Sequence, residues 1–190
     1  GLARLFSDAR ATLSSNGRLA GERVLPSSFL LDSWEGETYV GVRMALDRGA
    51  VTGIELVPPP EDDPDRVPLT ALDWRGVLDP ISAFIMPMPI GEALDGPSVC
   101  NRSLPVFDGW QRFDLQLFFK EVRSVRSVGQ GSYSGVVFVC GARYAPVAGH
   151  HPCDAGVQQL LANDSLEIWL ATLGGDVPYL VPYYVGLDTD

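Results

Sequence analysis

The sequence predicts a mainly β fold, in which a strongly curved antiparallel sheet, a half-barrel or β-spiral, wraps around a short two-part helical plug. At least seven segments carry strand signals, and in several of them apolar and polar residues alternate. Turn residues separate these segments, including two hairpin signals that contain aspartate and glycine. Only residues 69–90 have convincing helical character, and they lie between two sets of strands. The length of 190 residues fits one domain, which we assign to residues 1–190.

Strand signals dominate the part of the chain before the plug. Residues 1–13 fit either a helical stripe or, near their end, a strand, so both assignments stay open. Residues 14–17 predict a turn, and a short strand follows that ends before Pro26. Residues 37–46 alternate strictly and predict a half-buried strand. A tight turn at residues 47–49 then leads to a strand over residues 51–57, which three prolines end.

The plug, residues 69–90, is predicted as two short helical segments. Thr70 caps the first segment with Asp73 at the third position, a variant of the capping box, and Gly76 ends it. Asp79 followed by proline then signals a second start, because aspartate is a good N-cap and proline suits the first helical position. The resulting helix is apolar nearly all round up to Met88. We therefore expect it to be buried.

Strands also dominate the part after the plug. Asp108 and Gly109 form the strongest hairpin signal in the chain and lead into a strand over residues 110–120. Residues 133–144 are apolar on both faces, which predicts a central strand of the sheet. The remaining predicted segments are a loop at residues 148–154, a strand at residues 166–173, and an edge or bulged strand at residues 177–185 that contains Pro178 and Pro182.

Composition and charge exclude several classes of protein. The net charge is −10, the sequence pI is near 4.5, and the basic residues are scattered singly, so we expect no nucleic-acid partner and no anionic membrane surface. No run approaches the roughly 20 apolar residues that span a bilayer. The opening residues lack the basic start and apolar stretch of a signal peptide, which predicts a mature, trimmed product or a cytosolic protein.

Two groups of residues form a pattern shared with a known family. The first comprises Cys100, Leu104, Pro105, Val106, Phe107, Asp108, Gly109, Arg112, Phe113 and Asp114, and the second comprises Gly135, Val139, Cys140, Tyr144, Pro146, Ala148, Gly149 and His150. With Asp79, Pro80 and Ser82 upstream, the pattern resembles the domain-of-unknown-function 3108 family of alphaproteobacterial envelope proteins. The resemblance covers most of the chain from about Ser14 onward.

This family is similar to the lipoprotein carriers LolA and LolB, in which a curved antiparallel half-barrel is wrapped over helical segments. The resemblance implies a periplasmic protein of the cell envelope whose signal peptide has been removed. It implies no enzymatic activity, no catalytic residue and no cofactor. Family members usually have further strands before the position of Gly1 and one after Asp190, so the resemblance implies that terminal strands of the full-length protein are missing.

The resemblance also bears on the cysteines, because Cys100 and Cys140 match the two cysteines of the family. A bridge between them would close a loop of about 40 residues, which the chain-entropy model values at about 4 kcal/mol. A structural disulfide is our first expectation and would agree with an oxidising periplasm. Reduced thiols in the core, or a metal or redox role, are the alternatives. Cys153 is left over.

The sequence supports catalysis and metal binding poorly. Cys153, His150, His151 and Asp154 are potential metal ligands, but their spacing matches no zinc pattern, so we expect a loop with no metal. Asp108 and Asp114 could serve as paired carboxylates of a glycosidase. In the simpler interpretation, Asp108 forms a turn and Asp114 pairs with Arg112. Motifs of hydrolases, metalloproteases and nucleotide-binding enzymes are absent from the sequence, which predicts a protein that is not an enzyme.

Apolar residues of the plug and of the strands are the candidate binding site for a lipid or another apolar molecule. They are Phe84, Ile85, Met88, Phe113, Leu115, Leu117 and Phe138, which could line a cavity on the concave side of the sheet. Alternatively, these side chains fill the core. The leading hypothesis is a non-enzymatic periplasmic envelope protein that binds a lipid, another apolar ligand or the acylated segment of a partner. A structural or protein-interaction factor for envelope integrity, with a solid core and exposed Trp34 and Trp110, is the alternative; a hydrolase is a distant third.

Overall fold

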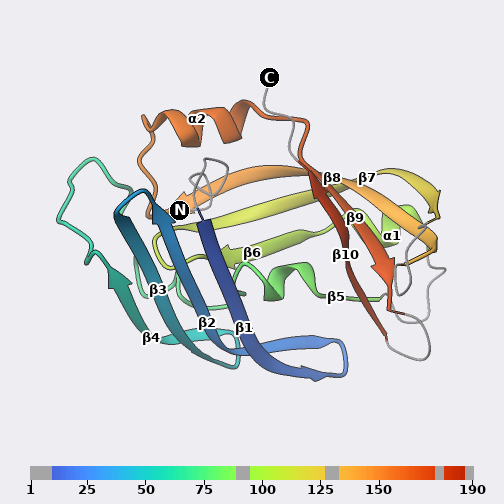
Figure 1. The fold of residues 1–190 in the computed structure, drawn as a ribbon, viewed down its shortest axis with the longest axis horizontal. Helices are drawn as coiled ribbons and strands as arrows, with labels where there is room; N and C mark the ends of the chain where they lie inside the picture. Colours follow the sequence, from blue (N-terminus) through green and yellow to red (C-terminus); the bar gives the residue numbers. More distant parts are fainter. Residues whose placement is uncertain (1–9, 89–94, 127–132, 174–177, 187–190) are drawn as a thin grey trace.

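The computed structural model describes residues 10–88, 95–126, 133–173 and 178–186. These residues form two antiparallel sheets that curve around an apolar interior (Figure 1). The first sheet is a meander of β1 (Arg10–Ala20), β2 (Arg23–Glu35), β3 (Thr38–Asp47) and β4 (Ala50–Val57). The second is a curled half-barrel with the order β5-β10-β9-β8-β7-β6. The predicted curved antiparallel sheet is confirmed.

The half-barrel combines one minimal strand with five longer ones. Its strands are β5 (Met86–Pro87), β6 (Ser103–Phe107), β7 (Arg112–Val125), β8 (Gly135–Ala148), β9 (Glu167–Thr172) and β10 (Tyr179–Gly186). β8 lies between β7 and β9, which confirms the central position that its two apolar faces predict. The register of β9 and β10 shifts between Pro182 and Tyr184, which confirms a bulged last strand.

The segment over residues 74–78 joins the two sheets. Arg75 forms a bridge with Ala50 at the start of β4, and Leu78 forms a bridge with Val106 in β6. Backbone hydrogen bonds support both bridges, including Val51 N to Trp74 O at 2.9 Å and Leu78 N to Pro105 O at 2.9 Å. The two sheets therefore form one wrapped wall from β1 to the short edge strand β5, which pairs with β10, and β1 and β10 stand on either side of its open side (Figure 1).

Each sheet has its own cluster of buried side chains. Phe29, Val42 and Met44 of the first sheet pack with Val77 from the joining segment and with Phe107 at the end of β6. The cluster of the second sheet contains Met86, Val99, Leu104, Phe113, Leu117, Phe138, Cys140, Ile168, Leu170 and Leu180, among others. The strict alternation of β3 places one face of the strand in the cluster of the first sheet. Val42, Met44 and Leu46 are buried, while Arg43 and Ala45 are exposed.

The plug is less helical than the sequence predicts. Residues 71–74 form a turn, and a short 3₁₀ helix, η2 (Ser82–Phe84), stands where we expected an apolar α-helix up to Met88. The chain then extends into β5, where Met86 and Pro87 pair with Leu180 and Tyr179. Pairing with the edge of β10 satisfies backbone groups that a longer helix would have satisfied internally, and Pro87 could not have donated a hydrogen bond within such a helix.

A second correction concerns residues 14–17, which lie within β1 rather than in a turn. The strand continues through them with a register shift between Asn16 and Gly17, and Gly17 lies opposite Pro26, which lies inside β2 rather than after a strand. The actual turn is at residues 21–22. Glycine is required at this bulge because a Cβ on Gly17 would lie 2.6 Å from Leu25 O and 2.8 Å from Pro26 Cα.

This close approach predicts a measurable cost for a side chain at the bulge. We expect Gly17→Ala to lower the free energy of unfolding by about 2 kcal/mol, because both close atoms belong to the backbone and cannot turn away. Gly53→Ala is the matched control, since its Cβ would meet only the Ala45 Cβ at 3.8 Å. Urea denaturation would measure both. Equal stability of the two variants would contradict the close approach.

Two short helices were missed by the sequence analysis. They are α1 (Gly96–Cys100) and α2 (Ala155–Ala162). Each begins after an aspartate that caps it, because the side chains of Asp95 and Asp154 accept hydrogen bonds from Ser98 N and Val157 N. Among the described residues, no helix has both the length and the apolar character needed to cross a membrane.

Candidate functional site

The four candidate ligand-binding residues from the strands are buried together beneath the half-barrel. Phe113, Leu115, Leu117 and Phe138 are between 2% and 8% exposed and belong to one cluster. Phe113 also packs against Tyr144, with 5.2 Å between the ring centres. Protein side chains therefore cover these four residues, and a ligand could reach them only if the cluster opened.

The three candidate residues from the plug are more accessible. Phe84 and Met88 are half-buried and pack against the cluster of the second sheet. Ile85 is also half-buried but is not part of that cluster. Ile81, one turn earlier, packs against the cluster of the first sheet instead. The plug thus touches both clusters and still exposes part of its apolar surface.

A buried carboxylate fixes the plug to the edge of the first sheet. Asp79 is completely buried, and its Oδ1 accepts hydrogen bonds from Ile81 N and Ser82 N, both at 3.0 Å. Its Oδ2 accepts a hydrogen bond from Ser15 Oγ of β1 at 3.0 Å. The hydroxyl groups of Ser15 and Ser82 lie 3.1 Å apart. Asp79 thus accepts the hydrogen bonds expected of an N-cap, but η2 itself begins after Ile81, and the carboxylate also ties β1 to η2.

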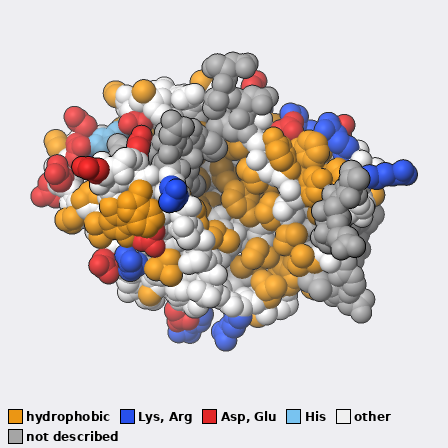
Figure 2. Space-filling model, in the orientation of Figure 1, with side chains coloured by type: hydrophobic (Ala, Val, Ile, Leu, Met, Phe, Trp, Pro, Cys, Tyr) orange, Lys and Arg blue, Asp and Glu red, His pale blue; other side chains and the backbone are white. Residues whose placement is uncertain are grey.

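The face that carries the open side of the wall is hollowed and apolar. Figure 2 shows hydrophobic side chains gathered across the middle of this face, between the first sheet and β10. Tyr179 of β10 spans the two sheets at one point, where its hydroxyl donates to Gly21 O in the turn between β1 and β2. The accessible surface of the plug and this recess together are the best candidate site for an apolar ligand.

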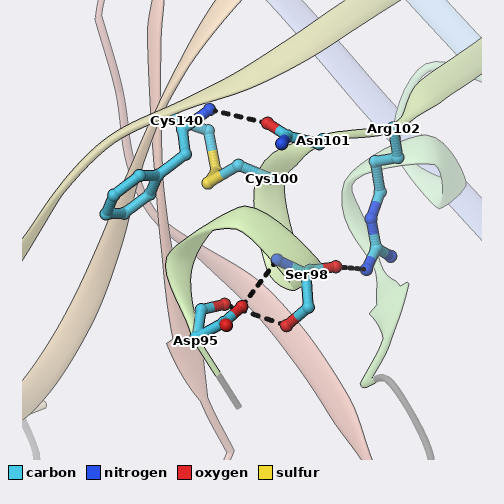
Figure 3. Close-up of a disulfide and its surroundings, with 7 residues drawn as sticks. Asp95, Ser98, Cys100, Asn101, Arg102 and Cys140 are labelled. Atoms are coloured by element: carbon cyan, nitrogen blue, oxygen red, sulfur yellow. Dashed lines mark hydrogen bonds between the residues drawn. A yellow bond between two sulfur atoms is a disulfide. The ribbon is translucent and has the colours of Figure 1, made fainter. Parts of the chain in front are cut away.

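A disulfide between Cys100 and Cys140 supports the wall from the inside (Figure 3). It links the end of α1 to β8, and both residues are completely buried. Asn101, next to the bridge, accepts a hydrogen bond from Phe119 N of β7 at 3.1 Å. Among our alternatives for these cysteines, the structural disulfide is confirmed. Cys153 is free and exposed.

His150 and His151 contact the loop that contains Asp63 and Val67. Within the described ranges, no group of three or more histidine, cysteine, aspartate or glutamate residues is placed to hold a metal ion. His151 Nε2 lies 3.4 Å from Asp63 Oδ2, and both side chains are about one third exposed (33% and 37%). His150 is buried, and burial followed by the neighbouring His151 lowers its pKa from the ordinary value. His150 O accepts a hydrogen bond from Val67 N, so its backbone joins two loops.

The two aspartates considered as paired carboxylates have the structural partners that the sequence predicts. Asp108 Oδ1 accepts hydrogen bonds from Trp110 N and Gln111 N, which forms the turn between β6 and β7. Arg112 Nη1 lies 2.6 Å from Asp114 Oδ1, so the predicted ion pair is confirmed. The exposed fraction of Trp34 is 44%, whereas Trp110 is half-buried against the cluster of the first sheet.

A pocket of about 350 Å³ lies on the opposite, outer face of the half-barrel and contains none of the predicted site residues. Lys120, Glu167, Trp169, Tyr183 and Tyr184 line it, together with Ser165 and Gly186. No family model, curated protein or solved structure matches the chain.

The outer pocket was missed because its residues come from three strands, of which β7 is far from β9 and β10 in the sequence. Trp169 and Tyr184 are cross-strand partners in β9 and β10, and Lys120 reaches them from β7. One local signal was available, since the bulge predicted from Pro182 precedes two consecutive tyrosines. A bulge can turn consecutive side chains toward one face, but the sequence does not reveal which strand lies beside it.

Proposed function

We propose that this is a non-enzymatic protein of the periplasmic cell envelope that binds a lipid or another apolar ligand on the concave side of its curved sheet. The observation that carries the proposal is the half-buried apolar surface of Phe84, Ile85 and Met88 in an open-sided wall. An extended acyl chain could cover this surface and gain about 25 cal/mol for each Å² of apolar area removed from water.

Two further observations support the compartment and the class of protein. The buried disulfide is of a kind that forms and persists in oxidising compartments, which include the periplasm. The curled sheet, the short interior helices and the resemblance of the sequence to the domain-of-unknown-function 3108 family agree with a carrier similar to the lipoprotein carriers. Such a carrier needs a surface that holds acyl chains rather than a reactive side chain.

Binding of a fluorescent fatty acid tests this proposal. We expect dansyl-undecanoic acid to bind saturably, and we expect Ile85→Gln and Met88→Gln to weaken binding about tenfold, because each replaces apolar contact area by a polar amide. Leu72→Gln is the matched control, since Leu72 is 76% exposed on the turn before η2. Circular dichroism would verify that each variant is folded. If the folded wild-type protein does not bind the probe, or all three variants bind it equally, the proposal is wrong.

A structural or protein-interaction factor for envelope integrity is the second candidate. It is favoured by the burial of Phe113, Leu115, Leu117 and Phe138, since a filled cluster needs no ligand for its stability. In that case the apolar recess and exposed aromatic residues such as Trp34 would contact another envelope protein. A folded protein that does not bind the acyl probe would support this second candidate.

A further inference from the structure

The pocket on the outer face of the half-barrel is built from aromatic rings and one ion pair. Trp169 lies beside Tyr183 with nearly parallel rings, 6.4 Å between the centres and 17° between the planes. Tyr184 meets Trp169 edge-on at 5.2 Å. Consecutive strand residues normally point to opposite faces, but the register shift between Pro182 and Tyr184 allows both tyrosines to line this pocket.

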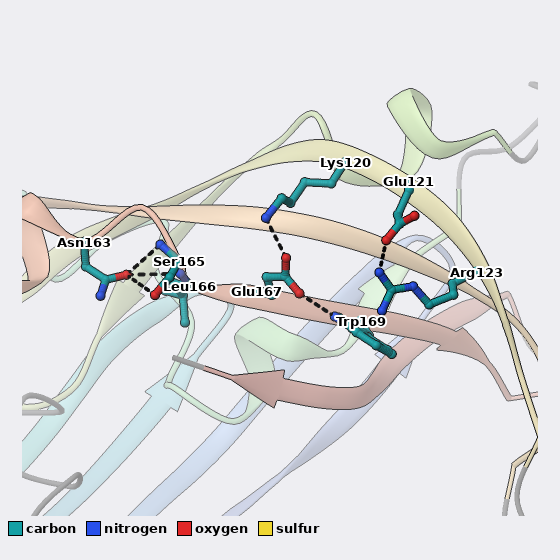
Figure 4. A network of polar contacts seen from close by, with 8 residues as sticks. All are labelled: Lys120, Glu121, Arg123, Asn163, Ser165, Leu166, Glu167 and Trp169. Carbon is teal, nitrogen blue, oxygen red and sulfur yellow. Dashed lines mark hydrogen bonds and ion pairs between the residues drawn. The ribbon is translucent and has the colours of Figure 1, made fainter. Parts of the chain in front are cut away.

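The polar part of the pocket is held in place by short hydrogen bonds (Figure 4). Lys120 Nζ donates to Glu167 Oε1 at 2.6 Å, and Trp169 Nε1 donates to Glu167 Oε2 at 2.9 Å. The hydrogen bond from Lys120, followed by that from Trp169, lowers the pKa of Glu167. The carboxylate therefore stays ionised at neutral pH, and each of its oxygens keeps one further lone pair for a ligand.

The indole of Trp169, which lines the pocket, is also held in position by residues outside the pocket. Arg123 lies over the Trp169 ring, 4.5 Å from its centre, and forms an ion pair with Glu121. Neither Arg123 nor Glu121 lines the pocket. Beneath the ring, Val139 is the cross-strand partner of Trp169 and is only 1% exposed. Trp169 is thus held between Arg123 and an apolar patch of β8, and the more exposed rings of the pocket are those of Tyr183 (41%) and Tyr184 (50%).

The charges around the pocket favour a neutral ligand. Lys120 balances Glu167, and Arg123 balances Glu121, so the four charges sum to zero. A cationic ligand would compete with the guanidinium group that already lies over Trp169 and would be repelled by Lys120. An anionic ligand would meet the Glu167 carboxylate. The fitting ligand is therefore uncharged, with an apolar face for the rings and hydroxyl groups that both donate and accept hydrogen bonds.

From this arrangement we propose that the outer pocket binds a neutral carbohydrate, with a sugar ring stacked on the exposed tyrosine rings beside Trp169 and its hydroxyl groups bonded to Lys120 and Glu167. A pyranose ring has the required chemistry, since its C–H groups form an apolar face and its hydroxyl groups lie around the rim. Charge-assisted hydrogen bonds are directional and strong, so the Lys120–Glu167 pair would orient the sugar. This site is independent of the apolar site on the concave side.

Titration with neutral oligosaccharides, followed by NMR of the four tryptophan indole groups, tests this inference. We expect cellotriose or chitotriose at up to about 10 mM to shift the Trp169 indole signal with millimolar affinity. The Trp34 indole, 44% exposed on the other sheet, provides an internal control whose signal should stay in place. Tetramethylammonium chloride at the same concentration serves as the cationic probe, and we expect it to leave the Trp169 signal unchanged.

Variants of the pocket separate stacking from hydrogen bonding. We expect Tyr184→Ala to weaken binding about fivefold through the lost ring, and Glu167→Gln to weaken it about tenfold through the lost charge. Trp34→Ala should bind as the wild-type protein does. If neither oligosaccharide shifts the Trp169 signal, if tetramethylammonium shifts it instead, or if the pocket variants bind as Trp34→Ala does, the inference is wrong.

Discussion

Removal of the disulfide by the double substitution Cys100→Ala and Cys140→Ala should lower the free energy of unfolding by about 4 kcal/mol. The bridge closes a loop with a sequence separation of 40, so it restricts the unfolded chain and stabilises the native state relative to it. It also fixes the end of α1 against β8 at a place with no exposure to solvent. Urea denaturation monitored by circular dichroism would measure the loss.

The free cysteine provides the control for this experiment. Cys153 is exposed and has no disulfide partner, so Cys153→Ala should leave the free energy of unfolding within about 0.5 kcal/mol of the wild-type value. Adding a reducing agent to the wild-type protein should reproduce the effect of the double substitution. A reduced protein as stable as the oxidised one would show that the bridge contributes little to the stability of the half-barrel.

Asp79→Ala should have the second largest effect, a loss of about 3 kcal/mol in the free energy of unfolding. The substitution removes the acceptor of two backbone N–H groups and of the Ser15 hydroxyl at a completely buried position. Because Ser15 belongs to β1, we also expect faster amide hydrogen exchange in β1 and in η2. Asp79→Asn keeps one carbonyl acceptor and should lose about half as much stability.

Asp73→Ala, in the first segment of the plug, is the matched control. Asp73 accepts hydrogen bonds from Thr70 N and Thr70 Oγ1 in an exposed turn, so water can replace them and the expected loss is about 1 kcal/mol. Similar losses for Asp73→Ala and Asp79→Ala would contradict the role of Asp79 as the attachment of the plug to β1.

Features coded by local patterns were predictable from the sequence. The alternation of residues 37–46, the two hairpin turns and the two-faced strand β8 all have the structure that their residues predict. In the first hairpin turn, Arg48 and Gly49 have positive φ angles of 50° and 79°. Tight hairpin turns require such angles and glycine adopts them readily, so the turn could be predicted from its residues. The ion pair between Arg112 and Asp114 was equally accessible, because the two residues share one face of a strand.

Features set by tertiary contacts were not predictable. The apolar stretch after Asp79 has a helix start signal, yet it forms only the short 3₁₀ helix η2 and then extends into β5, because β10 offers a partner for its backbone. Residues 14–17 have the composition of a turn, but β2 pairs with them and Gly17 accommodates the bulge. The outer pocket depends on the neighbours of β9, which no local pattern reveals. Local sequence patterns thus predicted most strands and turns. The structure of the other segments depends on which strand they pair with.

The central claim, that the concave side of the wall holds an apolar ligand, is tested most directly by native mass spectrometry of protein purified without detergent. We expect a second population of the folded protein with the added mass of a lipid or other acyl compound, which organic extraction should release and identify. We expect Met88→Gln to reduce this population and Leu72→Gln to leave it unchanged. A folded wild-type protein that carries no added mass and yields no lipid on extraction would contradict the account.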